Sequence, residues 1–393
     1  MAYADDDGIF GAMRAVSSQR NLILGLVFWL GLGHDVRGQG VEDLPDQLQA
    51  VVAVYATEYR APTSPPPATV NARVLPAASP VAAAIARVET VVVAPLRAEP
   101  VLVKAVRETA TIQIALDRRG FGIGLIDGQS GRKTQQALLD FRYITTNAVP
   151  EAEARRQLLD DPAPAFVWYE VTAGDLAQVG PRAADWEEAA QLPAMACHSL
   201  IEGLSEKFHA TDGFLRRLNP SVTNWGGGLV GRRLCVPNVR TEAVKFDVKQ
   251  IVVDTECFRL RGYDAKGRMV CSFPCSIARE RAKVPVGELR VANVAPHPNY
   301  TFDPANFPES ARAQQIGRKL ILPPGPRNPV GVYWISLSQP GYGMHGTPHP
   351  ETIGNMESHG CFRLCNWDAH TLGQGMFLGL PVRLDIPPVI FKK

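Results

Sequence analysis

The alternation of apolar and polar positions predicts a mostly β domain in the C-terminal part of the chain. Four short runs that are β-branched or alternating predict strands, at 248–253, 257–261, 269–277 and 332–337. The short sequence from Asp264 to Gly267 lies between two of these runs and predicts a hairpin turn. We therefore expect one mostly β domain over residues 242–388.

Helical spacing predicts a smaller module before this domain. In residues 106–162 the apolar Ala137, Leu138 and Phe141 have helical spacing, and Gly128 and Gly131 favour a turn before them. This pattern predicts a helix, a loop and a second helix.

A second module, residues 163–241, combines helical and strand patterns. The runs 204–208 and 214–218 have helical spacing, and Gly231 to Pro237 closes the module as a strand. The stretch between Asp175 and Ser199 contains Pro181, Trp186 and Pro193 and has neither of these patterns. The whole chain is therefore expected to be a multidomain α+β protein.

The N-terminal part has the composition of a targeting segment followed by a linker. An uncharged apolar run from Leu22 to Gly33 follows two arginines and has about the length of a signal-peptide core. We expect residues 1–40 to direct export, either as a cleaved signal or as an uncleaved membrane anchor. Residues 41–105 are rich in Pro and Ala, which predicts an extended linker.

Length and charge limit the remaining choices. A chain of 393 residues is expected to hold about two to four domains. Its 41 basic residues are balanced by 39 acidic ones and are not clustered, which argues against a nucleic-acid partner.

Candidate chemistry lies near the C-terminal end of the chain. His345 and His359 are both near Cys361 in sequence, and glycines accompany all three as Gly346 and Gly360. A thiolate attacks an amide when an adjacent base takes its proton, so these residues form a candidate acyl-transfer site.

Two plainer interpretations apply to the same residues. A single cysteine is often a buried small apolar residue, and three histidines with a thiolate could bind zinc. Pro348 and Pro350 flank His349 and disfavour the helix that a helical zinc motif needs. We therefore expect neither a metal nor another cofactor.

The combination of His-Gly-Thr at 345–347 with Ser-His-Gly-Cys-x-Arg-x-x-Asn at 358–366 resembles the signature of the L,D-transpeptidases, penicillin-insensitive enzymes that cross-link the bacterial cell wall. The resemblance implies a sandwich-like catalytic fold with Cys361 as the nucleophile and His345 as its base. Gly346 and Thr347 would orient the imidazole, and His359 would support the nucleophile loop or the bound donor. The backbone N–H groups of residues 360 and 361 would form the oxyanion hole.

The resemblance also implies a set of substrate-side residues, namely Tyr342, Thr347, Ser358, Arg363 and Asn366. Arg363 could bind a substrate carboxylate in a forked geometry or lock the loop through an internal salt bridge. Asn366 could instead be structural, because turn residues often bond their own backbone. The segments 296–300 and 323–331 resemble the substrate-side insert of the family.

Both N-terminal modules resemble wall-binding modules. Residues 106–162 resemble a peptidoglycan-binding module through Gly120-Phe121 and Ile126-Asp127-Gly128, where Asp127 either contacts sugar or shapes the loop. Residues 163–241 resemble a LysM glycan-binding module, and the segment between Asp175 and Ser199 departs from that pattern.

These resemblances imply an exported, cysteine-dependent L,D-transpeptidase of the periplasm or cell wall. The thiolate would attack the amide after the third residue of a peptidoglycan stem tetrapeptide, release D-Ala and leave a thioester. The resemblance does not identify the acceptor, which could be another stem peptide, a wall-attached protein, a free D-amino acid or water. With water as the acceptor the enzyme would be an L,D-carboxypeptidase. A cysteine amide hydrolase acting outside the wall and a non-catalytic wall-binding protein are the alternatives from other classes. Only the N-terminal segment, residues 1–40, would contact a membrane.

Seven cysteines in an exported chain fit one reactive thiol and up to three pairs. Cys197 and Cys235 bracket the second module and form one candidate disulfide. Folding the predicted hairpin brings Cys257 close to Cys275, which makes a second candidate.

Overall fold

The computed structural model describes residues 94–95, 102–144, 149–239, 245–280, 284–285, 287–308, 310–358 and 360–385. These residues belong to one compact unit, Pro76–Lys393. The predicted export segment 1–40 and nearly all of the predicted linker 41–105 lie outside the described residues. Within the described ranges, no helix is both long enough and apolar enough to cross a membrane.

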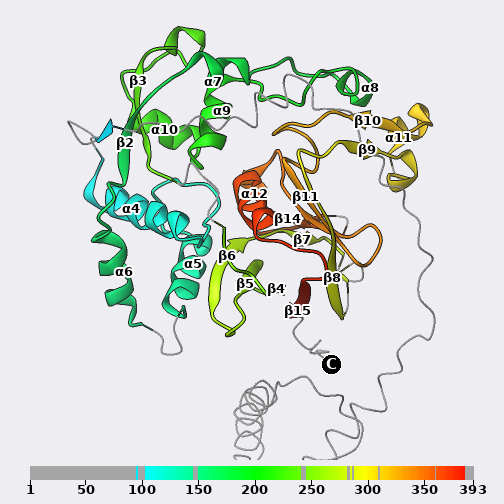
Figure 1. The fold of residues 1–393 in the computed structure, drawn as a ribbon. Coiled ribbons are helices and arrows are strands. Elements are labelled where there is room, and N and C mark those ends of the chain that lie inside the picture. Colours follow the sequence, from blue (N-terminus) through cyan, green and yellow to red (C-terminus); the bar gives the residue numbers. More distant parts are fainter. Residues whose placement is uncertain are drawn as a thin grey trace, which may run out of the picture. The chain divides into compact units, whose positions relative to one another are not determined.

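The C-terminal domain is built on one sheet of eight strands, in the order β14-β12-β11-β8-β15-β4-β5-β6 (Figure 1). Two neighbouring pairs, β4 with β15 and β12 with β14, are parallel, and the other pairs are antiparallel. The strands are β4 (Gln250–Asp254), β5 (Arg259–Tyr263), β6 (Met269–Pro274), β8 (Glu288–Pro296), β11 (Tyr333–Leu337), β12 (Gly343–His345), β14 (Phe362–Arg363) and β15 (Pro381–Asp385).

The strands expected from the alternating pattern are confirmed. β4, β5, β6 and β11 lie in or overlap the four predicted runs. The predicted hairpin joins β5 to β6, and the Asp264 N–H donates to the Arg268 carbonyl at 2.9 Å to close it. Gly267 has a φ of 71°, a left-handed conformation that glycine adopts without strain.

The C-terminal domain is mostly β, as predicted, and its main sheet is curled. Along β11 the side chains of Tyr333, Ile335 and Leu337 are buried, and they contribute to the core of the domain. Helix α12 (Asn366–Gln374) packs against β11 and adds Ala369 and Leu372 to the same core. The helix thus covers apolar surface that a second sheet would cover in a sandwich.

Two small pairs of strands accompany the main sheet. β7 (Ile277–Ala278) pairs with β13 (Met356–Ser358). Between β8 and β11 the chain forms a hairpin of β9 (Tyr300–Phe302) and β10 (Leu320–Leu322), with the short helix α11 (Ala311–Ile316) between them. We call the described residues of 297–331 the cap. They include most of the two segments that resemble the substrate-side insert.

The residues before the sheet form helices and a small second sheet. The helices α4 (Lys104–Arg118), α5 (Arg132–Arg142) and α6 (Glu151–Leu159) occupy the first predicted module, and the predicted second helix is confirmed as α5. In the second module, β2 (Phe166–Glu170) and β3 (Arg233–Pro237) pair antiparallel, and β1 (Ala94–Pro95) pairs with β2. Between β2 and β3 lie α7 (Ala173–Ala177), α8 (Trp186–Ala189), α9 (Leu200–Lys207) and α10 (Asp212–Leu218).

These two segments share one hydrophobic core. Leu116 and Leu138 from the first predicted module are in the same buried cluster as Phe208 and Phe214 from the second. The predicted boundary after residue 162 therefore does not separate two cores, and the two segments are expected to fold together.

The N-terminal helices meet strand β6 through a buried charged contact, which we call the junction. The Gly122 N–H donates to the Ser272 carbonyl at 2.8 Å, and the Ser272 N–H donates to the Gly120 carbonyl at 2.9 Å. Arg259 is only 1% exposed and donates to an Asp140 carboxylate oxygen at 3.2 Å and to the Gly122 carbonyl at 2.9 Å. A buried charge is stable only when it is paired and hydrogen-bonded in this way.

Candidate active site

Two parallel strands at one end of the sheet bring the candidate residues together. Met344 in β12 is the register partner of Phe362 in β14, and His345 is the partner of Arg363. Met344 and Phe362 are fully buried in the domain core. Because side chains alternate along a strand, His345, Arg363 and the preceding Cys361 lie on the opposite face of the two strands.

The imidazole of His345 is held in one orientation. Its Nδ1 lies 2.6 Å from the Gly346 carbonyl oxygen, which can only accept, so Nδ1 carries the proton and Nε2 keeps its lone pair. The ring stacks on Trp334 of β11 at 5.4 Å between ring centroids. Burial lowers the pKa of His345 to about 4, against the hydrogen bond to Gly346, so the imidazole is neutral at physiological pH.

The thiol of Cys361 is protonated in the resting protein. Its Sγ lies 3.5 Å from the Gly341 carbonyl oxygen, to which the thiol can donate. Burial raises the pKa of Cys361 to about 11, although a hydrogen bond with the Gly343 backbone and the charge of Arg363 act in the opposite direction. A thiol with such a pKa needs a base to become a nucleophile.

Arg363 and Tyr300 complete the surroundings of the thiol. The positive charge of Arg363 lowers the pKa of both Cys361 and His345, so the guanidinium lies within electrostatic reach of both. Tyr300 belongs to β9 of the cap, and its pKa is raised first by burial and then by its electrostatic interaction with Cys361. The cap therefore lies within electrostatic reach of Cys361.

Two residues expected on the substrate side, Asn366 and Thr347, have buried side chains. Asn366 is 1% exposed, and its amide accepts from the Val332 N–H at 3.2 Å and donates to the Pro326 carbonyl at 3.0 Å. Thr347 is also 1% exposed, and its hydroxyl accepts from the His349 N–H at 3.2 Å. Both side chains hydrogen-bond to backbone groups, which favours a structural role for them.

The remaining candidates differ in what the structure describes. Tyr342 is half-buried against the domain core, and Gly360 is buried directly before the thiol. The backbone of Ser358 lies in β13, and its side chain and His359 lie outside the described residues. Sequence reasoning missed Trp334, whose position in the strand beside His345 could be found only once the pairing of β11 with β12 was known.

Cys197, Cys235, Cys257, Cys275 and Cys365 are present as free thiols. The expected Cys197–Cys235 and Cys257–Cys275 disulfides are therefore not formed in this structure. Cys235 lies in β3, whereas Cys197 precedes α9 and lies beside Gly203. Cys197 and Cys235 bracket the second module in sequence, but their sulfurs do not form a bond. Among the described residues, no group of three or more His, Cys, Asp or Glu side chains could hold a metal ion.

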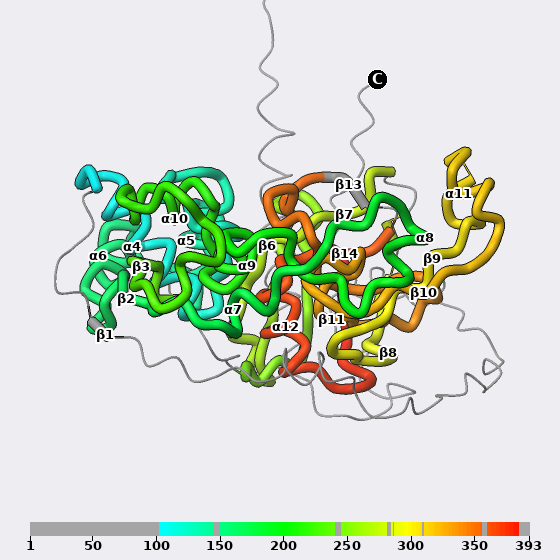
Figure 2. The backbone as a smooth tube through the Cα atoms, turned by 90° about the horizontal axis from the view of Figure 1, so that it is seen from above, coloured from blue at the N-terminus to red at the C-terminus, as the bar shows by residue number. Residues whose placement is uncertain are grey.

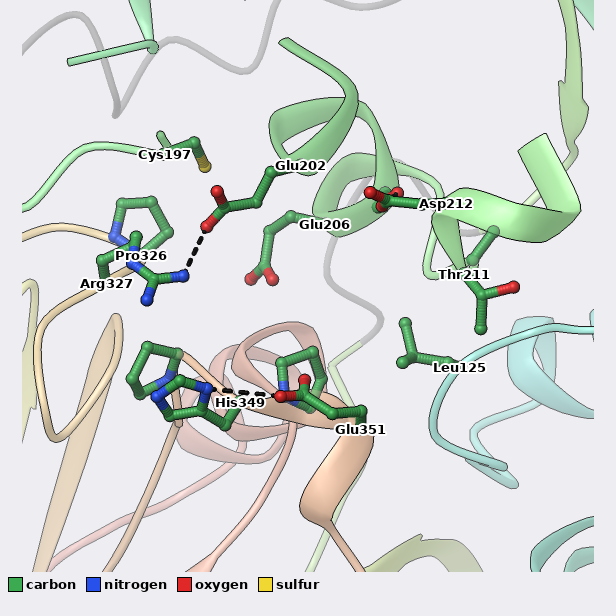
Figure 3. A pocket seen from close by; sticks show the side chains of 14 residues that line it. Leu125, Cys197, Glu202, Glu206, Thr211, Asp212, Pro326, Arg327, His349 and Glu351 are labelled. Atoms are coloured by element: carbon green, nitrogen blue, oxygen red, sulfur yellow. Dashed lines mark hydrogen bonds and ion pairs between the residues drawn. The ribbon is translucent and has the colours of Figure 1, made fainter. Parts of the chain in front are cut away.

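A separate cavity of about 320 Å³ lies between α9 and the loop after β12 (Figure 3). Arg327 donates to Glu202 across one wall at 2.8 Å, and His349 lies 3.3 Å from Glu351 on another. Burial raises the pKa of Glu206, which points into this cavity, to about 7. Neither Cys361 nor His345 lines the cavity, and His349 is thereby separated from the candidate dyad.

Asp127 in the first module shapes its loop. One carboxylate oxygen accepts from the Gln113 side-chain amide at 2.9 Å and from the Gln129 N–H at 2.8 Å. The side-chain oxygen of Gln113, Oε1, in turn accepts from the Gly128 N–H at 2.9 Å. These bonds favour the loop-shaping role of Asp127 over the sugar-contacting role.

Comparison with known proteins assigns the family. The family model of the L,D-transpeptidase catalytic domain, YkuD, matches residues 248–382. A putative L,D-transpeptidase YkuD of Bacillus licheniformis is 27% identical over 169 residues, which are 43% of this chain and 82% of that protein. A putative L,D-transpeptidase in the ATP synthase subunits region of Fuscovulum blasticum is 30% identical over 134 residues, 34% of this chain and 68% of that protein.

Other relatives are matched over a smaller share of their length. The probable L,D-transpeptidase ErfK/SrfK of Escherichia coli is 31% identical, and the chain spans 45% of it. The crystal structure of L,D-transpeptidase 3 from Mycobacterium tuberculosis has a TM-score of 0.28 at 16% identity, covering 36% of this chain and 61% of that one. From the family model and the sequence relatives, the chain belongs to the L,D-transpeptidase family and carries its catalytic domain.

Proposed function

We propose that the protein is a cysteine-dependent L,D-transpeptidase that acts on peptidoglycan stem tetrapeptides. The observation that carries this proposal is the hydrogen bond from His345 Nδ1 to the Gly346 carbonyl at 2.6 Å, on the strand beside that of Cys361. This bond presents Nε2 of a neutral imidazole as a base on the face that also carries a protonated thiol. The pair suits proton transfer at the moment of attack.

The chemistry follows from this starting state. Nε2 takes the thiol proton while the sulfur attacks the carbonyl carbon of the amide that precedes D-Ala. The tetrahedral intermediate collapses when its C–N bond breaks, and the imidazolium gives its proton to the leaving D-Ala amine. An acceptor amine then attacks the thioester, its proton passes to Nε2, and the departing sulfur takes that proton back. The backbone N–H groups of residues 360 and 361 are the proposed donors to the oxyanion.

The proposal extends to substrate contacts and location. Arg363 is the proposed partner of a substrate carboxylate, because its charge already acts on the thiol and the imidazole. Tyr342, Ser358 and His359 are proposed to line or support the nucleophile loop. Peptidoglycan lies outside the cytoplasmic membrane, so the proposal includes export to the periplasm or cell wall through residues 1–40.

Substitution of Cys361 tests the proposal. With purified tetrapeptide stems, Cys361→Ala is expected to lower D-Ala release by roughly a thousandfold or more, because no other group takes over the attack. Cys257→Ala removes a half-buried thiol outside the site and serves as the matched control, with release close to that of the natural protein. Mass spectrometry of the products separates amine transfer from hydrolysis. Retained D-Ala release in Cys361→Ala contradicts the proposal. If the natural protein binds the cell wall but releases no D-Ala, the non-catalytic wall-binding alternative is favoured instead.

Acylation by an inhibitor gives an independent test. The resemblance to the family implies that a carbapenem acylates Cys361, so the intact protein should gain the mass of the drug. Peptide mapping should place the adduct on residue 361 and find none in Cys361→Ala. An adduct on another cysteine counts against the site.

A further inference from the structure

The additional segment of the second module contacts the cap of the catalytic domain. We call residues 178–198 the insert, since they lie between α7 and α9. Helix α8 of the insert lies beside β9 and β10, as both views show (Figures 1 and 2). The contact joins parts of the chain that are more than a hundred residues apart in sequence.

The insert and the cap form one hydrophobic cluster together. Ala189 of the insert is buried with Phe302, Leu320 and Leu322 of the cap, and Trp186 packs against them. The Trp186 ring stacks on Phe302 at 4.8 Å between centroids, with an interplanar angle of 20°. A two-stranded hairpin is only marginally stable by itself, so the cap depends on this cluster for its position.

Polar contacts surround the cluster. Arg312 of α11 donates to Asp185 at 2.7 Å and to Glu187 at 2.9 Å. The Met195 N–H donates to the Pro324 carbonyl at 2.9 Å, and the Arg327 N–H donates to the Met195 carbonyl at 3.0 Å. The two segments are therefore joined by backbone hydrogen bonds as well as by side chains.

A third contact continues into the body of the second module. The side chain of Arg327 donates to Glu202 of α9 at 2.8 Å (Figure 3). Gly325 lies so close to the Met195 backbone that a Cβ at this position would overlap it. The base of the cap is thus seated directly on the module.

The cap also lies close to the proposed catalytic residues. A Cβ on Gly331, at the end of the cap, would overlap the backbone of Gly346, which follows His345. Tyr300 of β9 packs near Trp186, with 6.2 Å between ring centroids, and it lies within electrostatic reach of Cys361. Any change in how Trp186 packs is therefore expected to disturb the part of the cap beside the site.

We propose that the insert is a brace that holds the cap over Cys361, and that Trp186 is a positioning residue for the stem-peptide donor. The inference rests on the proposed function, because it assigns the donor site to the space between the cap and the thiol. Trp186 touches no reacting atom. It acts through Phe302 and Tyr300.

The test compares Trp186→Ala with Trp186→Phe in the full chain. Hydrogen exchange of the cap amides at 300–302 and 320–322 is expected to become about tenfold faster in Trp186→Ala, because the stacked ring is lost. KM for the tetrapeptide should rise about five- to tenfold while kcat changes less than about twofold. Trp186→Phe keeps an aromatic ring and should restore most of both values.

Trp225→Ala is the matched control within the same module. Trp225 packs in the core of the N-terminal segments and stacks with Arg216, and it has no contact with the cap cluster. This variant is expected to lose stability while cap exchange and KM stay near those of the natural protein. If Trp186→Ala does not fold, Arg312→Ala removes only the exposed ion pairs with Asp185 and Glu187 and should raise cap exchange about twofold.

Alkylation of the thiol separates failure of the brace from failure of the proposed function. Iodoacetamide should modify Cys361 faster in Trp186→Ala, which peptide mapping detects without any substrate. Unchanged exchange, alkylation and KM in Trp186→Ala, together with an inactive Cys361→Ala, overturn the brace alone. An active Cys361→Ala beside faster cap exchange in Trp186→Ala overturns the proposed function and leaves the brace as a purely structural contact.

Discussion

The junction and the brace both attach the N-terminal segments to the catalytic domain, and they are built from opposite chemistry. The junction places a fully buried arginine, Arg259, against Asp140 at the edge of the sheet farthest in strand order from β14. The brace uses a half-buried tryptophan, Trp186, with an exposed ion pair around Arg312.

The difference indicates which contact holds the fold and which one adjusts the site. A buried ion pair is lost only at a large free-energy cost, because breaking it leaves an unpaired charge without water. An aromatic cluster edged by exposed charges can loosen in small steps. We therefore expect the junction to control stability and the brace to control substrate affinity.

The largest effect is expected at the junction. Arg259→Met leaves Asp140 buried with Arg261 as its remaining cationic partner, at 2.9 Å. The free energy of unfolding should fall by roughly 3 kcal/mol, the lower end for broken buried pairs, because Arg261 still compensates the charge of Asp140. Urea denaturation followed by circular dichroism measures this change.

A second variant tests the cause of that loss. Arg259→Met combined with Asp140→Leu removes both charges, so it should be more stable than Arg259→Met alone. KM measured under fully folding conditions should stay close to that of the natural protein in both variants. A large rise in KM without loss of stability would reverse the roles of the two contacts.

The next largest effect on stability is expected from acid pH, through the titration of His345 in the candidate active site. The folded pKa of His345 is about 4, below its usual 6.5, so the unfolded chain binds a proton that the folded chain does not. This contribution to stability is present above pH 6.5 and is lost as the pH falls to about 4, by up to about 3 kcal/mol. His345→Gln should remove this part of the pH dependence of unfolding.

The same titration governs activity. Nε2 must be unprotonated to act as a base, so kcat/KM should stay level down to about pH 5 and fall below about pH 4, the pKa of His345. A loosened cap is expected to hydrate the imidazole and move this limit toward higher pH in Trp186→Ala, but not in Arg259→Met. If the pH at which kcat/KM falls is the same in Trp186→Ala as in the natural protein, the brace does not affect the environment of His345.

The smallest effect is expected from the exposed charges of the brace. Arg312→Ala should change kcat/KM by less than about twofold and leave the unfolding transition nearly unchanged, because water already solvates the pair. The effect should be visible at low ionic strength and disappear in high salt. Arg233→Ala breaks an exposed pair with Glu170, which joins β3 to β2 away from the brace, and is the control.

Local patterns predicted the parts of the molecule that depend on neighbours in sequence. The strands β4, β5, β6 and β11 follow from apolar alternation, and the hairpin follows from Asp264 to Gly267. The proposed pairing of His345 with Cys361 rests on the family-like spacing of the two motifs and stays a prediction. Each of these signals lies within a few residues of what it predicts.

Long-range packing accounts for what could not be predicted. The contact of Trp186 with Phe302 and the burial of Arg259 against Asp140 join segments more than a hundred residues apart, and no local pattern marks either. Asn366 and Thr347 lie within the family-like motifs, so their burial was hidden by their position in sequence. The shared core of the two N-terminal segments was missed for the same reason.

The amide of Asn366 links the brace to the proton chemistry. Its oxygen lies against Gly331 at the end of the cap and against Gly346, so closely that a methyl group on either glycine would collide with it. Gly346 supplies the carbonyl that fixes the tautomer of His345. A change in how the base of the cap packs is therefore expected to reach the imidazole of His345 through this one side chain.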